Sequence, residues 1–169
     1  MDEFGKLDEI DIKILREMSI DSRHSLRSLG EIIDKSPITI KRHLEAMEKR
    51  GIVKDYGITI DYEQLGFDII ALIELTISKG KMLEVEKEIA EDPNVFAVYD
   101  ITGQYDALIL AKFRSRNDLS ELVKNINSKE YVIRTNTHLI LNVIKEGTSF
   151  DELYKKEKMK QKKENNDDN

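Results

Sequence analysis

The apolar residues of this 169-residue chain change their spacing at Gly51. Before that glycine they recur every three or four positions, which is typical of helices that bury one face. From Ile52 to Ile60 they alternate with other residues, which is typical of a strand. The change predicts an α+β chain with four parts: a helical domain over residues 1–51, a strand and linker over 52–67, a second domain over 68–148 and a charged tail over 149–169.

Three short helices are expected in the first part, and each has a start signal. Asp8, Ser25 and Ser36 are of the residue types that accept hydrogen bonds from free amides at a helix N-terminus. Pro37 stands at the first helical position of the third helix, where proline loses no hydrogen bond. That helix is expected to end at Gly51, because glycine adopts the left-handed conformation most easily. The tight turn before the third helix makes the order a helix-turn-helix.

Strands and helices alternate in the second part. Their composition and spacing predict strands over residues 69–77, 95–101, 105–113 and 132–145, with helices over about 81–91 and 116–127. The order β-α-β-β-α-β is that of a ferredoxin-like domain. The complete expectation is a three-helix winged helix-turn-helix joined by a β-strand linker to a ferredoxin-like βαββαβ domain. Because such folds serve many functions, particular residues must indicate the function.

The tail differs in composition from both domains. From Lys155 onward the chain is rich in lysine and asparagine and has almost no apolar residues. Such a segment buries too little apolar surface to offset the entropy of ordering. We therefore expect a disordered tail, or the start of a frayed helix.

The charge distribution bears on a nucleic-acid partner. The net charge of −6 disfavours such a partner. Between Lys35 and Lys54, however, six lysines and arginines stand beside only two glutamates. A cationic segment in an acidic protein attracts phosphate at that segment alone, which orients the approach to DNA. A solvated helix face would carry the same charges, so both interpretations stay open on charge alone.

The third helix has one apolar side and one cationic side. On a helical wheel Ile40, Leu44 and Met47 fall within a narrow arc and predict the buried side. On the opposite side arginine can contact guanine or phosphate, and an exposed isoleucine can contact a thymine methyl group. The predicted DNA-contacting residues are Ser36, Ile38, Thr39, Lys41, Arg42, Glu45, Lys49 and Lys54. The alternative is a three-helix packing module with a solvated face, and His43 is assigned either to packing or to a phosphate contact.

A composite of short motifs resembles the Lrp/AsnC (feast/famine) family of transcription regulators. The motifs are Leu7-Asp8-x-x-Asp11-x-x-Ile14-Leu15, Asp21-x-Arg23-x-Ser25, Ser36-Pro37 with Arg42, Gly51-Ile52-Val53 and Gly103-Gln104-Tyr105-Asp106. The resemblance extends over about residues 5–147. Within these motifs, Arg23 is expected to form a structural salt bridge or cap rather than to contact DNA.

The resemblance implies double-stranded DNA as a partner and homodimers, built through the ferredoxin-like domains, that often assemble into tetramers or octamers. It also implies a small-molecule effector, commonly an amino acid, bound between protomers. Carried over, the effector-binding positions are Thr102, Gly103, Gln104, Tyr105, Asp106, Thr135 and Thr137. Asp106 can pair with an α-ammonium group, or alternatively satisfy turn amides at the start of a strand. The chain departs from the family at Gln104, where an acidic residue is frequent, and after Phe150, where the family usually ends.

Composition argues against other classes of protein. Without cysteine, and with three histidines far apart, the chain offers no disulfide, metal site or cofactor pattern. The absence of a long apolar run and the acidic start predict a cytoplasmic protein without a membrane partner. It is expected not to be an enzyme. Two alternatives stay open: an enzyme similar to the sirohaem decarboxylases, using His138, Tyr105 and Arg134, and a co-regulator that oligomerises without reading DNA.

Overall fold

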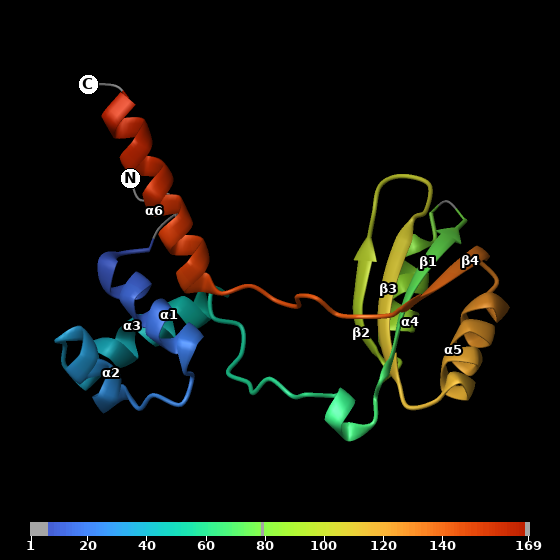
Figure 1. Cartoon of the computed structure of the whole chain (residues 1–169), viewed down its shortest axis with the longest axis horizontal. Helices are drawn as coiled ribbons and strands as arrows, with labels where there is room; N and C mark the ends of the chain where they lie inside the picture. Colours follow the sequence, from blue (N-terminus) through green and yellow to red (C-terminus); the bar gives the residue numbers. More distant parts are fainter. Residues whose placement is uncertain (1–6, 79, 168–169) are drawn as a thin grey trace. The chain divides into compact units, whose positions relative to one another are not determined.

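The computed structural model describes residues 7–78 and 80–167, with side chains as far as residue 160. The chain divides into two compact units, which are described separately. The first unit comprises Met1–Thr59 with Glu146–Asn169, and the second comprises Ile60–Lys145 (Figure 1).

Three helices begin the first unit: α1 (Glu9–Ile20), α2 (Leu26–Ile33) and α3 (Pro37–Lys49). Their predicted caps are confirmed, because the side chains of Asp8, Ser25 and Ser36 each accept a hydrogen bond from an amide of the first turn. Gly51 follows α3 in the left-handed conformation, with φ of 69°. The local signals that start and stop these helices are thus the ones the structure uses.

The core of this unit takes residues from all three helices. Ile14 of α1, Leu29 of α2, and Ile40 and Met47 of α3 are completely buried together. The predicted apolar side of α3 is therefore confirmed as its buried side. Because that side packs inward, the opposite side of α3 is held at the surface.

The strand predicted over residues 52–60 is wrong for the structure described. Residues 52–62 contain no strand, and Ile58 is 84% exposed. A strand requires a hydrogen-bonded neighbour, and no other strand of the described chain pairs with this segment. Tyr56 instead fixes the segment to α3 by donating a 2.7 Å hydrogen bond to Glu48. Its burial and the Glu48 charge raise the pKa of Tyr56 to about 12.

The second unit begins after a short 3-10 helix, Glu63–Leu65. Its elements are β1 (Ile69–Ile77), α4 (Met82–Ala90), β2 (Val95–Asp100), β3 (Ala107–Phe113), α5 (Arg116–Ser128) and β4 (Val132–Ile140). The sheet has the order β2-β3-β1-β4 and every neighbouring pair is antiparallel. This order confirms the predicted ferredoxin-like arrangement.

One face of the sheet packs against α4 and α5. Alternate residues of β1 and β3, including Ile73, Leu75, Ile109 and Phe113, form this core together with residues of both helices such as Ile126. On the other face lie Leu72, Glu74 and Thr76 of β1, which are only half-buried within one chain. This second face is called the open face below.

The last strand is shorter than predicted. It ends at Ile140, and residues 141–145 are exposed and not in a strand. The reason is its partner: Ile140 lies opposite Ile70 near the first residue of β1, so that the following residues have no β1 residue to pair with.

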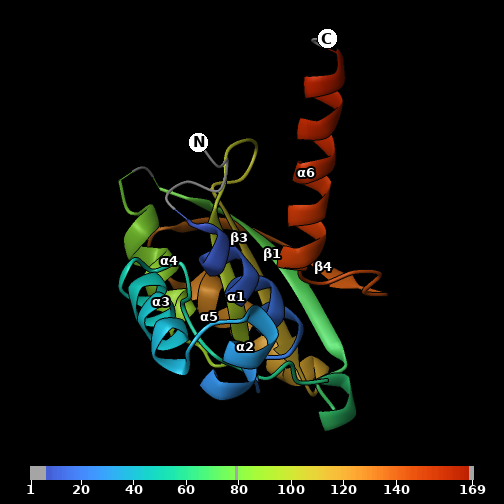
Figure 2. The same cartoon turned by 90° about the vertical axis from the view of Figure 1, so that its left-hand side faces the viewer.

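Of the two forms expected for the tail, disorder is wrong for residues 150–167, and the helical alternative agrees with the structure. These residues form α6 (Phe150–Asp167), whose first turns lie against α1 in the first unit while its C-terminal part extends away from the three helices (Figures 1 and 2). None of the helices in the described part of the chain combines the length and apolar character needed to cross a bilayer.

Candidate functional site

The turn between α2 and α3 places the N-terminus of α3. Asp34 adopts the left-handed conformation with φ of 59°, and the amide of Lys35 donates a 2.9 Å hydrogen bond to the carbonyl of Gly30. Gly30 is buried, with so little space above its Cα that a methyl group would meet the carbonyl oxygen of Lys35 at 2.6 Å. The turn is therefore tight, as in helix-turn-helix proteins, and it requires glycine at position 30 because no side chain fits there.

Ser36 closes the first turn of α3. Its Oγ accepts a 3.1 Å hydrogen bond from the amide of Thr39 and lies 2.8 Å from the Thr39 hydroxyl. Two residues predicted to contact DNA thus also stabilise the helix start. Both remain at the end of α3 where amide groups point outward, a place that suits a phosphate group.

We expect a Ser36→Ala variant to lose about 1 kcal/mol of unfolding free energy, because the Thr39 amide loses its acceptor. Ser36→Asp keeps an acceptor and should unfold close to wild type. Urea unfolding followed by circular dichroism measures both. If the alanine variant were as stable as the aspartate variant, the cap would contribute nothing.

The exposed face of α3 is formed by five of the predicted DNA-contacting residues. They are Ile38, Lys41, Arg42, Glu45 and Lys49. Ile38 is 81% exposed, although burial of an isoleucine is normally favourable. The wheel prediction that these side chains point to solvent agrees with the structure, while their contact with DNA stays a prediction. Lys54, beyond the helix, is exposed as well.

Arg42 and Lys49 are the cations of this face for which no salt bridge is formed within the described residues. Lys41 lies 3.5 Å from Glu45 one turn away, which neutralises part of its charge. Among residues 7–78 and 80–160, no carboxylate forms a salt bridge with Arg42. A guanidinium group with free donors at the surface can bind two acceptors of a guanine base or a phosphate.

His43 packs against α1, as the first of its two assignments expects, while its contact with phosphate stays untested. Its side chain is 12% exposed, and Nδ1 lies 2.7 Å from a carboxylate oxygen of Asp11 in α1. The carboxylates of Asp8 and Asp11 are already engaged in the capping box of α1. The three side chains therefore join α3 to α1, and their hydrogen bonds explain the cluster without a metal ion.

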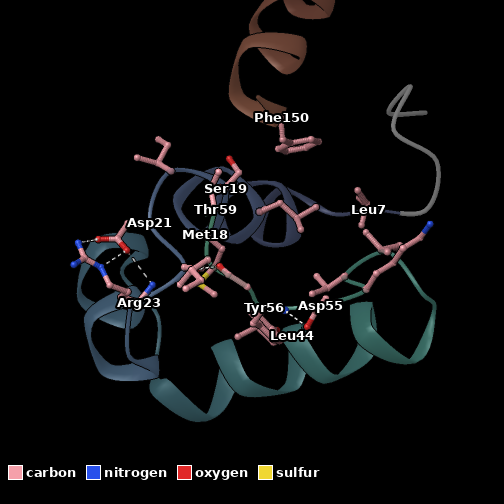
Figure 3. Close-up of a pocket in the computed structure, with 18 residues that line it drawn as sticks. Leu7, Met18, Ser19, Asp21, Arg23, Leu44, Asp55, Tyr56, Thr59 and Phe150 are labelled. Atoms are coloured by element: carbon pink, nitrogen blue, oxygen red, sulfur yellow. Dashed lines mark hydrogen bonds and ion pairs between the residues drawn. The ribbon is translucent and has the colours of Figure 1, made fainter. Parts of the chain in front are cut away.

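Arg23 also has the structural role expected of it. Its guanidinium group donates two hydrogen bonds to the carboxylate of Asp21, at 2.8 and 2.7 Å. These bonds lower the pKa of Asp21 and keep the pair charged at the start of the α1–α2 loop (Figure 3).

The predicted effector positions around Gly103 lie in the turn between β2 and β3. Thr102, Gly103 and Gln104 are exposed, and Gly103 has φ of 132°, which other residues rarely adopt. Asp106 ends the turn. Its Oδ2 accepts a 2.8 Å hydrogen bond from the amide of Ile77 in β1. Asp106 therefore has a structural bond, but to an amide of β1 rather than to the turn amides expected from the sequence, and its contact with an effector stays a prediction.

The structure brings Thr135 to the same end of β1 as this turn. Leu75 of β1 accepts a hydrogen bond from the Asp106 amide, and the same Leu75 lies opposite Thr135 of β4. The Thr135 hydroxyl, however, donates to Asn127 of α5 at 3.2 Å. Thr137 is two residues further along, opposite Ile73. Within one chain, the turn and these threonines therefore flank β1 without forming a closed site.

Two further residues near the turn were not among the predicted effector positions. The Arg134 guanidinium lies over the ring of Tyr105, 5.2 Å from its centroid. Glu86 of α4 is buried, and burial together with the charges of Asp100 and Asp106 raises its pKa. In both cases the interacting residues are far apart in the sequence, so residue spacing could not predict that they interact.

The open face of the sheet carries a small polar cluster. Glu74 of β1 lies 3.1 Å from Nε2 of His138 and accepts a 2.8 Å hydrogen bond from Asn136, both on β4. These bonds hold the pKa of Glu74 below its usual range. Because His138 is exposed and Glu74 and Asn136 are half-buried in one chain, another molecule can cover the cluster.

Two family descriptions match the chain. Residues 7–54 match a winged helix-turn-helix DNA-binding domain, and residues 70–150 match the Lrp/AsnC ligand binding domain. Among relatives, an uncharacterised HTH-type transcriptional regulator of Pyrococcus abyssi is 36% identical over 83% of this chain and 95% of its own length. The HTH-type transcriptional regulator Ptr1 of Methanocaldococcus jannaschii is 30% identical over 85% of this chain and 98% of its own.

Solved structures show the same likeness. A transcriptional regulator of Neisseria meningitidis in complex with L-Met superposes with a TM-score of 0.76 and 29% identity, covering 85% of this chain and 96% of that one. AsnC of Escherichia coli superposes with a TM-score of 0.78 and 25% identity, covering 84% of this chain and 97% of that one.

Proposed function

Because the chain belongs to the Lrp/AsnC family of transcriptional regulators, we propose that it is a cytoplasmic, sequence-specific DNA-binding regulator whose activity responds to a small metabolite. The observation that carries the DNA-binding part is the exposed face of α3, with Ile38 turned to solvent and Arg42 without a carboxylate partner in the described chain. An exposed cationic helix behind a tight turn is the arrangement that enters the major groove.

The effector is proposed to be an amino acid bound at the β2–β3 turn. The carboxylate of Asp106, together with that of Asp100, can pair with the α-ammonium group of an amino acid. The guanidinium group of Arg134 can pair with its carboxylate. The related regulator from Neisseria meningitidis was solved with L-Met, which is an amino acid. Since the turn is open in a single chain, we propose that a second protomer completes the site.

The proposed oligomer is a homodimer built through the second unit, with tetramers or octamers as further assemblies. The open face of the sheet exposes the Glu74–His138–Asn136 cluster and only half-covers its leucines. Such a face gains free energy when a second copy buries it. A dimer also presents two α3 helices, which suits half-sites about one helical turn apart or a multiple of it.

Neither alternative gains a specific observation. For a sirohaem decarboxylase, Tyr105 and Arg134 would have to face the substrate, whereas here they stack on each other. The relatives named above are transcriptional regulators rather than enzymes. If the chain were a co-regulator that does not read DNA, the exposure of Ile38 and Arg42 on α3 would have no explanation.

The decisive experiment is binding of the purified full-length chain to fragmented genomic DNA, sequenced with and without a mixture of amino acids. We expect enrichment of a sequence with two similar half-sites, and a change in occupancy or spacing when the mixture is added. Enrichment of no sequence under either condition would refute the DNA-binding part. An unchanged pattern would refute the amino-acid part.

The role of Asp106 can be separated from its structural bond. Asp106→Asn keeps an oxygen that accepts from the Ile77 amide but removes the charge, so we expect normal folding and at least about tenfold weaker binding of an amino-acid effector. Asp106→Ala should in addition lower the unfolding free energy by about 1–3 kcal/mol. Calorimetry with the amino acid selected above measures the first effect. Equal affinity of Asp106→Asn and wild type would limit Asp106 to its structural bond.

A further inference from the structure

Two buried side-chain oxygen atoms have no hydrogen-bond partner among the described residues. They are Oε1 of Glu86 in α4 and Oγ1 of Thr76 in β1. Glu86 is only 8% exposed. A buried carboxylate without a partner is costly, because it loses its water and gains no bond in return. Folded proteins rarely keep such a group, so Glu86 indicates a partner that a single chain does not supply.

Glu86 lies next to the β2–β3 turn. It follows Val85 on the buried side of α4, the side that packs on the sheet through Val85 and Ile89. Burial raises the pKa of Glu86, and so do the negative charges of Asp100, the last residue of β2, and Asp106, which directly precedes β3. The three carboxylates are therefore close enough to repel one another.

The turn holds its aspartates in place and carries the second unpartnered atom. The Ile101 amide donates a 2.9 Å hydrogen bond to the carbonyl of Asp106, and the Ile77 amide donates to the Asp106 side chain at 2.8 Å. Thr76 precedes Ile77 on the open face of the sheet, opposite Arg134 of β4. Unpartnered polar atoms thus lie near this turn on both faces of the sheet.

The charges around the turn do not balance. Glu86, Asp100 and Asp106 contribute three carboxylates, and Arg134 contributes one guanidinium group. Within residues 7–78 and 80–160, no lysine, arginine or histidine forms a salt bridge with any of these carboxylates. An amino acid with an apolar side chain brings one ammonium and one carboxylate group, so its ammonium pairs with the aspartates and Glu86 stays uncompensated. A second amino group would supply the missing positive charge.

We propose that Glu86 is a specificity-determining residue of the effector site, which selects an amino acid with a second amino group on its side chain. This proposal rests on the amino-acid effector proposed above. Because Glu86 is almost completely buried, a compact ammonium group with three donors reaches it more easily than a planar guanidinium group does. Lysine is therefore the natural probe, and arginine is expected to bind more weakly.

Calorimetry with the full-length chain tests the selection. L-lysine and L-norleucine have the same carbon chain and differ only in the second amino group. We expect lysine to bind at least about tenfold more tightly, since a hydrogen bond between two charged groups is among the stronger ones. The diamine 1,5-diaminopentane has both amino groups and no carboxylate. It should bind more weakly than lysine, because Arg134 then lacks its partner, and equal binding would overturn the amino-acid form of the proposal.

The role of Glu86 is tested by Glu86→Gln, which keeps the shape of the side chain and removes its charge. This variant should bind lysine about tenfold more weakly than wild type and norleucine equally well. Glu91→Gln is the matched control, because Glu91 is an exposed carboxylate at the end of the same helix. It should leave both affinities unchanged.

The outcomes separate this proposal from the function on which it rests. Equal affinity of wild type for lysine and norleucine would overturn the selection, and this comparison needs no variant. A Glu86→Gln variant that keeps the preference for lysine, or that loses both ligands equally, would overturn the role of Glu86. If wild type bound neither these probes nor any other amino acid, the amino-acid effector itself would be refuted.

Discussion

A Gly30→Ala variant is expected to lose the turn of the helix-turn-helix, although alanine normally stabilises a helix relative to glycine by about 0.5–1 kcal/mol. The added Cβ would lie 2.6 Å from the carbonyl oxygen of Lys35 and 3.5 Å from the nitrogen of Pro37. Both atoms belong to the backbone, and the bond from the Lys35 amide to Gly30 holds the turn in place. The clash cannot be relieved by rotating a side chain.

The expected cost exceeds the usual gain. Forcing one extra carbon into a packed site costs about 1–3 kcal/mol, or more where backbone must shift. The first unit should therefore unfold at lower temperature, and binding to DNA should be lost, because α3 no longer starts from its native position. Thermal unfolding followed by circular dichroism and a gel shift on the selected DNA measure the two effects.

Gly57→Ala is the matched control. Gly57 lies in the same unit, and its added Cβ would meet nothing within 4 Å. This variant should unfold at or slightly above the wild-type temperature, since alanine reduces the entropy of the unfolded chain. Were Gly30→Ala as stable as Gly57→Ala, the turn would be looser than the structure indicates.

Features governed by neighbouring residues could be predicted from the sequence. The caps Asp8, Ser25 and Ser36, the stop at Gly51 and the buried side of α3 each depend on contacts within a few positions. The order of strands and helices in the second unit was equally readable, because each element has its own apolar period. These signals were sufficient for the fold.

Features governed by distant residues were missed. The tail forms a helix that docks through Arg16 and Asp151, which are 135 positions apart in the sequence. The segment 52–60 has the composition of a strand but lacks a pairing strand among the described residues, and β4 ends opposite the first residues of β1. Composition describes what a segment can form, while the partner decides what it does form.

The two candidate sites differ in the same way: one depends on neighbouring residues and the other on distant ones. The exposed face of α3 follows from the wheel, because a helix fixes where each side chain points. At the effector turn, the bond from Ile77 to Asp106 spans 29 positions, and the stacking of Arg134 on Tyr105 also spans 29. Such pairings depend on the sheet register, which the sequence pattern does not specify across separate strands.

An Arg42→Ala variant is expected to bind its DNA sequence about 5- to 150-fold more weakly, which corresponds to about 1–3 kcal/mol, if Arg42 contacts a base. The exposed guanidinium has no carboxylate partner in the described chain, so removing it should leave the unfolding free energy within about 0.5 kcal/mol of wild type. Loss of affinity without loss of stability is the combination that identifies a contact residue. Fluorescence anisotropy at fixed salt measures the affinity.

Salt separates contact with a base from contact with phosphate. Lys41→Ala should weaken binding to all sequences alike and lower the slope of log affinity against log salt by about 1, since one phosphate contact is lost. Lys13→Ala on α1 is the control, because Lys13 is an exposed cation paired with Glu9 in the same unit but not on α3. It should leave both sequence preference and salt slope unchanged.

The double variant Lys41→Ala, Arg42→Ala gives the sharpest result. If α3 reads the major groove, this variant should lose preference for the selected sequence while the three helices stay folded. If it bound the selected sequence as wild type does, the cationic side of α3 would be a solvated face. The exposure of Ile38 would then have to be explained by another partner, since an isoleucine that is 81% exposed gains nothing from its own fold.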